Sequence, residues 1–139
     1  MALTRAEVQA TFSAANSAVI DDGQAITSDA ITPHANATPL AMLHVQADVT
    51  AGAAINATDT VDVFILYTGG DREGSGSDDY DTVEHAVFVC TLNLAAADPA
   101  RASREVSIQC KGYQIRFVNN STVSDRQTTV SANLTEQRT

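Results

Sequence analysis

Apolar and polar side chains alternate along several short segments of the chain, which is the pattern of half-buried β-strands. The alternation is regular in residues 40–49, 106–110 and 113–118, and it returns with more polar residues in 128–134. We therefore expect a strand in each of these segments, with one face turned to a core. Residues 83–94 are expected to form another long strand, with one apolar face made of Ala86, Phe88, Cys90, Leu92 and Leu94.

The segment VDVFILY, residues 61–67, differs from the others because it is apolar on both faces. It is short, rich in β-branched residues and flanked by turn residues, which together favour a strand over a helix. A strand without a polar face is typical of the centre of a sheet that is covered on both sides. The sequence therefore predicts a central strand here.

Turn residues separate these strands at intervals of roughly ten to twenty residues. An Asp-Asp-Gly turn follows residue 20, a Lys-Gly turn follows residue 110, and two prolines bound a loop at residues 33–39. No helical segment is long enough to connect parallel strands. We expect an all-β fold: an antiparallel, jelly-roll-like β-sandwich of about eight strands.

The first twenty residues allow more than one interpretation. Thr4 and Glu7 have the spacing of a helix capping box, whereas Val8, Ala10 and Phe12 alternate as in a strand. We favour an extended conformation, which is either an N-terminal arm that reaches a neighbouring molecule or the first strand pair of the sandwich. Residues 1–20 are thus the arm or first strand, and residues 21–139 a single β-sandwich domain.

The central strands supply the large apolar side chains that we expect between the two sheets. Fully burying one such side chain contributes about 1.5–3 kcal/mol to folding. On this basis Phe88→Asp should unfold the domain. The expected core consists of Phe64, Ile65, Phe88, Ile108, Ile115 and Phe117.

Composition and charge limit the possible partners. The chain has 139 residues, 44 % of them hydrophobic, and a formal net charge of −9 from 17 acidic and 8 basic residues. A nucleic-acid partner is not expected, because binding requires Lys and Arg to neutralise phosphates. A membrane is not expected either, because anionic lipid would repel this charge and no apolar run approaches the ~20 residues of a membrane span.

The sequence also suggests a compartment. The first five residues are not followed by the apolar region of a signal peptide, so we expect synthesis and assembly in a cytoplasm. A reducing compartment disfavours disulfides. Cys90 and Cys110 are therefore expected to be buried thiols, with a disulfide between them as the alternative.

Between two apolar strands lies TGGDREGSGSDDYD, residues 68–81, in which five carboxylates stand among glycines and serines. Asp71, Asp79 and Asp81 are the candidate calcium ligands, since Ca²⁺ prefers several carboxylate oxygens. However, the EF-hand pattern is absent. The favoured interpretation is a solvated loop, and we expect no metal and no other cofactor.

Catalytic motifs are not recognisable in the sequence. The three histidines, His34, His44 and His85, stand in no zinc-binding motif. His34 lies in the proline-bounded loop, and the other two are expected on the polar faces of strands. No G-x-S-x-G nucleophile elbow is present. We expect a protein that is not an enzyme, with a hydrolase that uses the acidic loop as an alternative.

Carbohydrate recognition usually relies on exposed aromatic side chains. The chain has no Trp and three tyrosines, of which Tyr80 lies in the acidic loop. Tyr80 is therefore the one candidate for a glycan contact. A carbohydrate-binding attachment module remains an alternative function.

Residues 25–134 resemble the small β-sandwich virion proteins of tailed bacteriophages. The segment TVDVFILYTGGD, residues 60–71, is similar to a strand of those proteins that leads into a variable loop. The segment YQIRFVNN, residues 113–120, is similar to the late strand that closes their sheet. Both motifs are structural, and neither brings catalytic residues with it.

This resemblance implies a non-enzymatic structural protein of the virion. It implies above all a capsid decoration or cement protein, which binds the assembled major capsid shell from outside and stabilises it. The implied partners are the major capsid protein or other virion proteins, and the implied assembly is a homotrimer. A fibre, tail or adaptor component is the alternative place on the particle.

Five residues are the candidates for contacts with such partners: Val8, Phe12, Val19, Ile20 and Tyr80. The first four lie in the N-terminal segment, which as an extended arm could add a strand to an exposed sheet edge. The fifth lies in the acidic loop.

Overall fold

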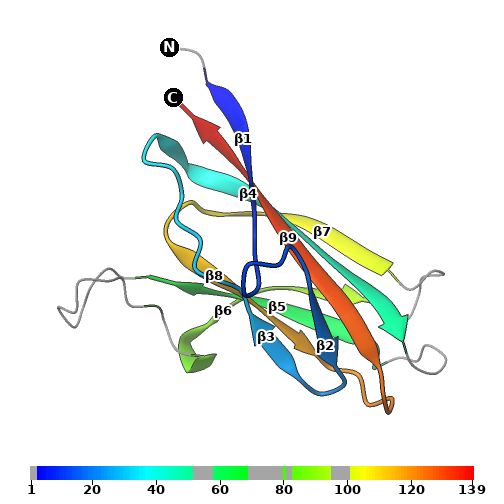
Figure 1. Cartoon of the computed structure of the whole chain (residues 1–139). Helices are drawn as coiled ribbons and strands as arrows, with labels where there is room; N and C mark the ends of the chain where they lie inside the picture. Colours follow the sequence, from blue (N-terminus) through cyan, green and yellow to red (C-terminus); the bar gives the residue numbers. More distant parts are fainter. Residues whose placement is uncertain (1–2, 52–57, 69–79, 81–82, 95–100) are drawn as a thin grey trace.

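The computed structural model describes residues 3–51, 58–68, 80, 83–94 and 101–139. These residues form nine antiparallel β-strands and one short 3₁₀-helix, η1 (Figure 1). The all-β fold expected from the sequence is confirmed. The elements are β1 Thr4–Gln9, β2 Ala18–Asp21, β3 Ala25–Thr27, β4 Ala37–Ala51, β5 Thr60–Tyr67, η1 Val83–His85, β6 Val87–Asn93, β7 Arg101–Gln109, β8 Tyr113–Asn119 and β9 Gln127–Arg138.

The strands form two packed sheets with a nested order of pairing. One sheet has the order β1-β9-β4-β7, with β2 also paired to β9, and the other has the order β3-β8-β5-β6. The early strands β1 and β2 therefore meet the last strand, β3 meets β8, β4 meets β7, and β5 meets β6. This is the winding of a jelly roll, as the alternation and turn spacing predicted.

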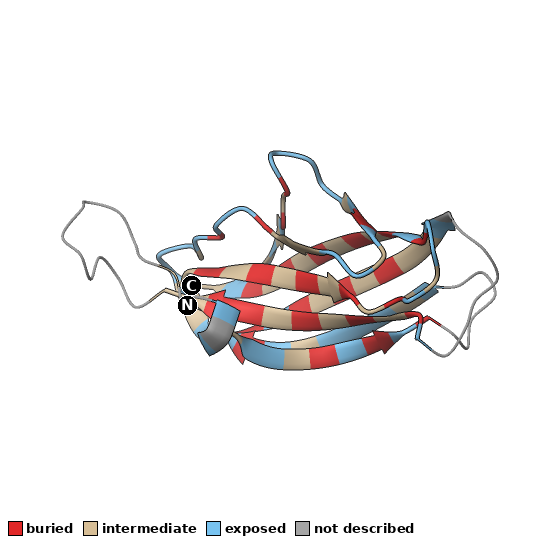
Figure 2. Cartoon of the chain, turned by 90° about the horizontal axis from the view of Figure 1, so that it is seen from below, coloured by how far each residue is buried: buried red, intermediate tan, exposed pale blue. Residues whose placement is uncertain are grey.

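One core fills the space between the sheets, and Figure 2 shows buried residues alternating with less buried ones along the strands. The alternation predicted for β4 and β8 is confirmed, because every second residue is buried from Ala41 to Ala47 in β4 and throughout β8. The side chains that are at most 1 % exposed include Leu43, Val45, Val61, Val63, Ile65, Tyr113, Ile115, Phe117, Val130 and Leu134.

A β-bulge in β6 reverses the prediction for Phe88. Cys90 pairs with Val63, but the next pair along β5 is Phe64 with Phe88, so Val89 is an extra residue. Because side chains alternate with a period of two, one extra residue moves those beyond it to the other face. Phe88 is therefore 57 % exposed, and its assignment to the core is wrong.

The bulge also changes the environment of β5. This strand lies between β8 and β6, as predicted for a central strand, but its outer face is covered only in part, at Leu66, which is 4 % exposed. Asp62 and Phe64, on its outer face, are only half-buried. The rings of Phe64 and Phe88 meet edge-on there, with centroids 5.7 Å apart. The remaining four expected core residues are buried: Ile65, Ile108, Ile115 and Phe117.

Three strands extend beyond the predicted segments, and one is shorter. β4 begins at Ala37, inside the expected proline loop, and β7 begins at Arg101, before the predicted segment 106–110. β9 runs to Arg138, beyond the predicted segment 128–134, and it lies between β1 and β4. Residues 83–85 form η1, so His85 does not lie on a strand as expected.

The N-terminal segment forms strands of the sandwich, not a helix. β1 pairs along its whole length with β9 of the same chain, with Thr4 opposite Arg138. Both ends of the described chain consequently lie at one end of the molecule (Figure 1). Within this structure the segment corresponds to the first-strand interpretation.

A strained two-residue turn follows β1. Phe12 and Ala15 pair across it, while Ser13 and Ala14 have positive φ angles of 48° and 69°. The Asp29 carboxylate accepts hydrogen bonds from the N–H groups of Ala14 and Ser13. The bond from Ala14, and then one from the Thr11 hydroxyl, lowers the pKa of Asp29. The Asp29 carboxylate thus stabilises this turn, whose backbone angles are unfavourable for residues other than glycine.

The predicted Asp-Asp-Gly turn is confirmed. The Gln24 N–H donates to the Asp21 carbonyl at 3.1 Å, and Gly23 has the positive φ of 70° that glycine tolerates best. The turn does not form a hairpin, because β2 pairs with β9 in one sheet and β3 with β8 in the other. It therefore carries the chain from one sheet to the other.

We expect Ala14→Gly to stabilise the protein by about 1 kcal/mol, because glycine adopts a positive φ without the clash that alanine suffers. For a chain of this size the melting temperature should rise by about 2–4 °C. Ala15→Gly is the matched control, since Ala15 is also exposed but has no positive φ; it should not raise stability. Equal effects of the two substitutions in thermal unfolding would contradict the analysis.

We expect Phe88→Ala to cost no more than about 1.5 kcal/mol, the range of a lost aromatic pair, because most of its ring is exposed. Phe117→Ala should cost about 3–5 kcal/mol, as for other buried phenylalanines. Urea denaturation measures both values. A loss for Phe88→Ala as large as that for Phe117→Ala would mean that the bulge does not exist.

Candidate interaction site

The two sheets end together on one side of the sandwich, where β6 closes one sheet and β7 closes the other. Between these edge strands lies an open groove of about 600 Å³, the β6–β7 groove, lined by residues 87–89, residues 106–109, Ile65 and Tyr67. Val87 is 49 % exposed and Phe88 57 % exposed. Folding therefore leaves large apolar side chains open to solvent at this edge.

The β6 strand lacks the usual protection of an edge strand. Natural edges are guarded by charges, by proline or by shortness. β7 carries Arg101, Arg104 and Glu105, β1 carries Arg5 and Glu7, and β3 has only three residues. β6, with the sequence VFVCTLN, contains neither charge nor proline. Its one protective feature is the bulge, so it is the edge best suited to contact with another molecule.

Basic side chains flank the groove. The Lys111 ammonium lies 4.7 Å from the centre of the Tyr67 ring. Burial raises the pKa of the Cys90 thiol, and the nearby Arg104 opposes this shift. The other basic residues between 101 and 118 lie elsewhere, because Arg101 pairs with Asp48 and Arg116 donates to Thr27 of β3.

A second hollow, of about 440 Å³, lies on the outer face of the other sheet, over β1, β4, β7 and β9. Its centre is apolar, with Leu40 61 % exposed and Met42 41 % exposed. Polar side chains surround this centre, among them Arg5, Ser107, Thr135 and Gln137. We call this surface the Leu40–Met42 face. An apolar centre inside a polar rim is the usual composition of a protein–protein interface.

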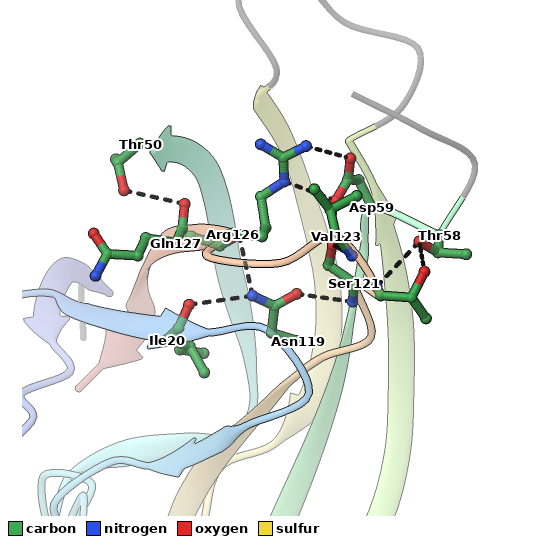
Figure 3. A network of polar contacts seen from close by, with 11 residues as sticks. Ile20, Thr50, Thr58, Asp59, Asn119, Ser121, Val123, Arg126 and Gln127 are labelled. Atoms are coloured by element: carbon green, nitrogen blue, oxygen red, sulfur yellow. Dashed lines mark hydrogen bonds and ion pairs between the residues drawn. The ribbon is translucent and has the colours of Figure 1, made fainter. Parts of the chain in front are cut away.

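A buried ion pair closes the end of the sandwich at which β5 begins (Figure 3). The Arg126 guanidinium donates to both carboxylate oxygens of Asp59, at 2.9 and 3.0 Å, and both side chains are buried. The Ser121 hydroxyl donates to the same carboxylate at 2.6 Å, and the Asn119 amide donates to the Ile20 carbonyl. These bonds join the two sheets, and the role of the pair is structural.

A second buried cluster lies at the opposite end. The Glu136 carboxylate accepts a hydrogen bond of 2.8 Å from Arg138 and lies 3.9 Å from the Cys110 sulfur. Burial, and then Glu136, raises the pKa of the Cys110 thiol. The Tyr113 hydroxyl is buried and has no hydrogen-bond partner among the described residues.

Both cysteines are free, so the expectation of thiols is confirmed, although Cys110 is only half-buried. Raised pKa values keep both thiols protonated at neutral pH, whereas a nucleophilic cysteine needs a lowered one. Neither Cys90 nor Cys110 therefore has the properties of an activated nucleophile.

The histidines lie apart. His34 accepts a hydrogen bond from the Asn36 N–H, and His44 lies 3.7 Å from Glu105 on the outer face of β4. In the part of the chain that the structure describes, no three His, Cys, Asp or Glu side chains come together as a metal site requires. The candidate calcium ligands, Asp71, Asp79 and Asp81, lie outside the described residues, so that hypothesis stays untested.

No helix among the described residues is long and apolar enough to span a bilayer.

The five predicted contact residues have different environments. Phe12 and Ile20 are buried in the core, and Val8 is half-buried against it. Val19, on β2, is 56 % exposed. Tyr80 is half-buried and pairs with Thr68 at the end of β5. Of the five, Val19 alone presents a large apolar side chain mostly to solvent.

The sequence analysis missed both apolar surfaces. The sequence shows that Leu40 and Met42 are apolar and that Met42 falls on the predicted polar face of β4. An apolar residue on a polar face was a signal that could have indicated an exposed apolar surface. For the β6–β7 groove the sequence contains a weaker signal, because residues 87–93 carry no charge. Its opening depends on the bulge and on which strands end each sheet, and neither is visible in one segment.

We expect Arg126→Met to destabilise the protein by about 3–5 kcal/mol, because it leaves the Asp59 carboxylate buried without its partner. The double variant Asp59→Asn, Arg126→Met should be more stable than Arg126→Met alone. A double-mutant cycle in urea measures this coupling. Simple additivity of the two substitutions would show that the pair does not act as a unit.

Comparison with known proteins finds no matching family model and no matching curated protein. Among solved structures the chain is similar to one described as "Crystal structure of infectious bursal disease virus VP2 subviral particle", with a TM-score of 0.48 and 11 % identity. The match covers 98 % of this chain and 33 % of that one. The chain thus spans about a third of that protein's length, and at this similarity the match supports no statement about function.

Proposed function

We propose that the chain is a non-enzymatic structural protein of a tailed-phage virion. Its role is that of a capsid decoration or cement protein, which binds the assembled shell from outside and stabilises it. The observation that carries the proposal is the Leu40–Met42 face, an apolar centre in a polar rim on the broad outer side of a sheet. Exposed apolar patches of this kind mark interaction sites.

The fold brings the two segments that carry the sequence resemblance next to each other. The two segments that resemble tailed-phage virion proteins, residues 60–71 and 113–120, contribute neighbouring strands, because β5 pairs with β8 from Val61 opposite Asn119 to Tyr67 opposite Tyr113. Jelly rolls are frequent in viral capsid proteins, although lectins use them too. Because a fold alone does not determine function, the proposal depends on the surfaces.

The energetics suit a protein that works by contact. Covering one exposed side chain such as Leu40 or Met42 contributes about 1.5–3 kcal/mol at most, so a single contact is modest. A trimer that presents three such faces to a shell gains from multivalency. The net charge of −9 keeps the free protein soluble and favours a basic partner surface.

The proposed partner is the major capsid protein, the proposed site the capsid exterior, and the proposed assembly a homotrimer formed in the host cytoplasm. The charged side chains that the structure buries, Asp59, Arg126 and Glu136, each have a charged partner, Arg126 with Asp59 and the partly exposed Arg138 with Glu136. Such pairs hold the fold together, which agrees with a protein that transforms no substrate. A place in the tail, fibre or adaptor is the alternative within the same class.

Binding to tailless shells tests the proposal. We expect the protein to sediment with assembled shells that lack decoration, and not with free capsid subunits. The double variant Leu40→Asp, Met42→Asp should bind roughly tenfold more weakly or worse, because it places two charges in an apolar contact.

Val83→Asp is the matched control, since Val83 is 54 % exposed and does not line the Leu40–Met42 face. It should bind as the unaltered protein does. The proposal is wrong if the protein ignores the shells, or if the double variant binds them normally. Binding to isolated tails but not to shells would favour the alternative place on the particle.

A further inference from the structure

We propose that copies of this chain associate head to tail, with the β2–β3 edge of one copy seated against the β6–β7 groove of the next. The inference rests on the proposed function for its setting, since it names the contact that would build the homotrimer. Its physical argument is independent of that function, because it depends on different side chains from Leu40 and Met42, although Ser107 lines both hollows.

The two surfaces lie on opposite sides of the sandwich. β1 and β2 stand at one end of the first sheet and β7 at the other, while β3 and β6 end the second sheet. β2 approaches β3, and β6 approaches β7. A molecule with complementary surfaces on opposite sides can bind a copy on each side without covering its own faces.

The β6–β7 groove is the receiving surface. Its exposed side chains, Val87 and Phe88, are apolar, and β6 carries no charge that would repel a neighbouring strand. Arg104, two residues before Val106 on β7, and Lys111, beside the Tyr67 ring, flank the groove with positive charge. The groove therefore fits a partner that presents an apolar side chain next to carboxylates.

The β2–β3 edge presents that combination. Val19 is 56 % exposed on β2. Asp21 is exposed at the end of β2, and Asp22 follows it in the turn that leads to β3. Asp29 is already bonded to the turn after β1, so Asp21 and Asp22 supply the negative charge of this edge. In the proposed contact they meet the positive charge of Arg104 and Lys111, which flank the groove.

Charge also decides between the possible arrangements of two copies. A twofold contact of groove with groove would bring Arg104 and Lys111 of each copy towards their counterparts, and such like-charge contacts are unfavourable. A contact of groove with the β2–β3 edge brings opposite charges together. This is a heterologous contact, which forms a closed ring when its rotation allows it, and a trimer is such a ring.

Charge reversal on each side, alone and combined, tests the inference. The edge variant is Asp21→Lys, Asp22→Lys, and the groove variant is Arg104→Glu, Lys111→Glu. Sedimentation velocity over a concentration series measures association, and thermal unfolding verifies that each variant is folded. We expect the unaltered protein to form oligomers and each variant to associate roughly tenfold more weakly or worse.

The chain that carries both reversals is the decisive control, because its edge is basic and its groove acidic. It should regain the association that each reversal removes. Failure to regain it would overturn the inference, as would an edge variant that assembles normally or an unaltered protein that stays monomeric at every concentration. Shell binding is measured separately, so a monomer that still binds shells would contradict this contact and not the proposed function.

Discussion

The side-chain period of two is the constraint on which the rest of this structure depends. In a two-layered sandwich each strand must turn every second side chain inward, so the register of one strand fixes that of its neighbours. From Ala41 to Ala47 in β4, and along β5, β8 and β9, the strands obey this rule and fill the core. The bulge at Val89 breaks it in the edge strand β6, and the pairing of β4 with β9 shifts register near the two ends of β4. Because the bulge in β6 lies in an edge strand, Phe88 is the one side chain lost from the core, and it remains exposed as an apolar side chain.

Charged groups divide into those that close the sandwich and those that remain on its edges. Arg126 with Asp59 closes one end, and Arg138 with Glu136 closes the other. Each charge of a buried pair offsets the desolvation of the other, so the loss of one member is strongly destabilising. These groups therefore hold the layers together and are not free for chemistry. What the described surface offers other molecules is apolar area with charges at its rim.

The sequence predicted the elements whose pattern is local. Alternation identified β4 and β8, and the Asp-Asp-Gly turn was recognised from its residues. The sequence analysis failed where the pairing with another strand determines which side chains are buried. The bulge that exposes Phe88 is a property of the pairing of β6 with β5. β9 was predicted only over residues 128–134 and as a more polar strand, yet its inward residues, such as Thr128 and Ala132, are small enough to be buried between larger ones. The apolar surfaces depend on which strands end the sheets, which no single segment reveals.

An unprotected edge strand is a hazard for a protein that exists as a free monomer, since it invites uncontrolled pairing. Three edges of this sandwich are guarded by charge or by shortness, and β6 is not. An edge strand that a partner covers in the assembled state needs no protective charge or proline. The charges at its rim then determine which partner surface binds. The asymmetry between the two sides of the molecule is what limits such contacts to one orientation.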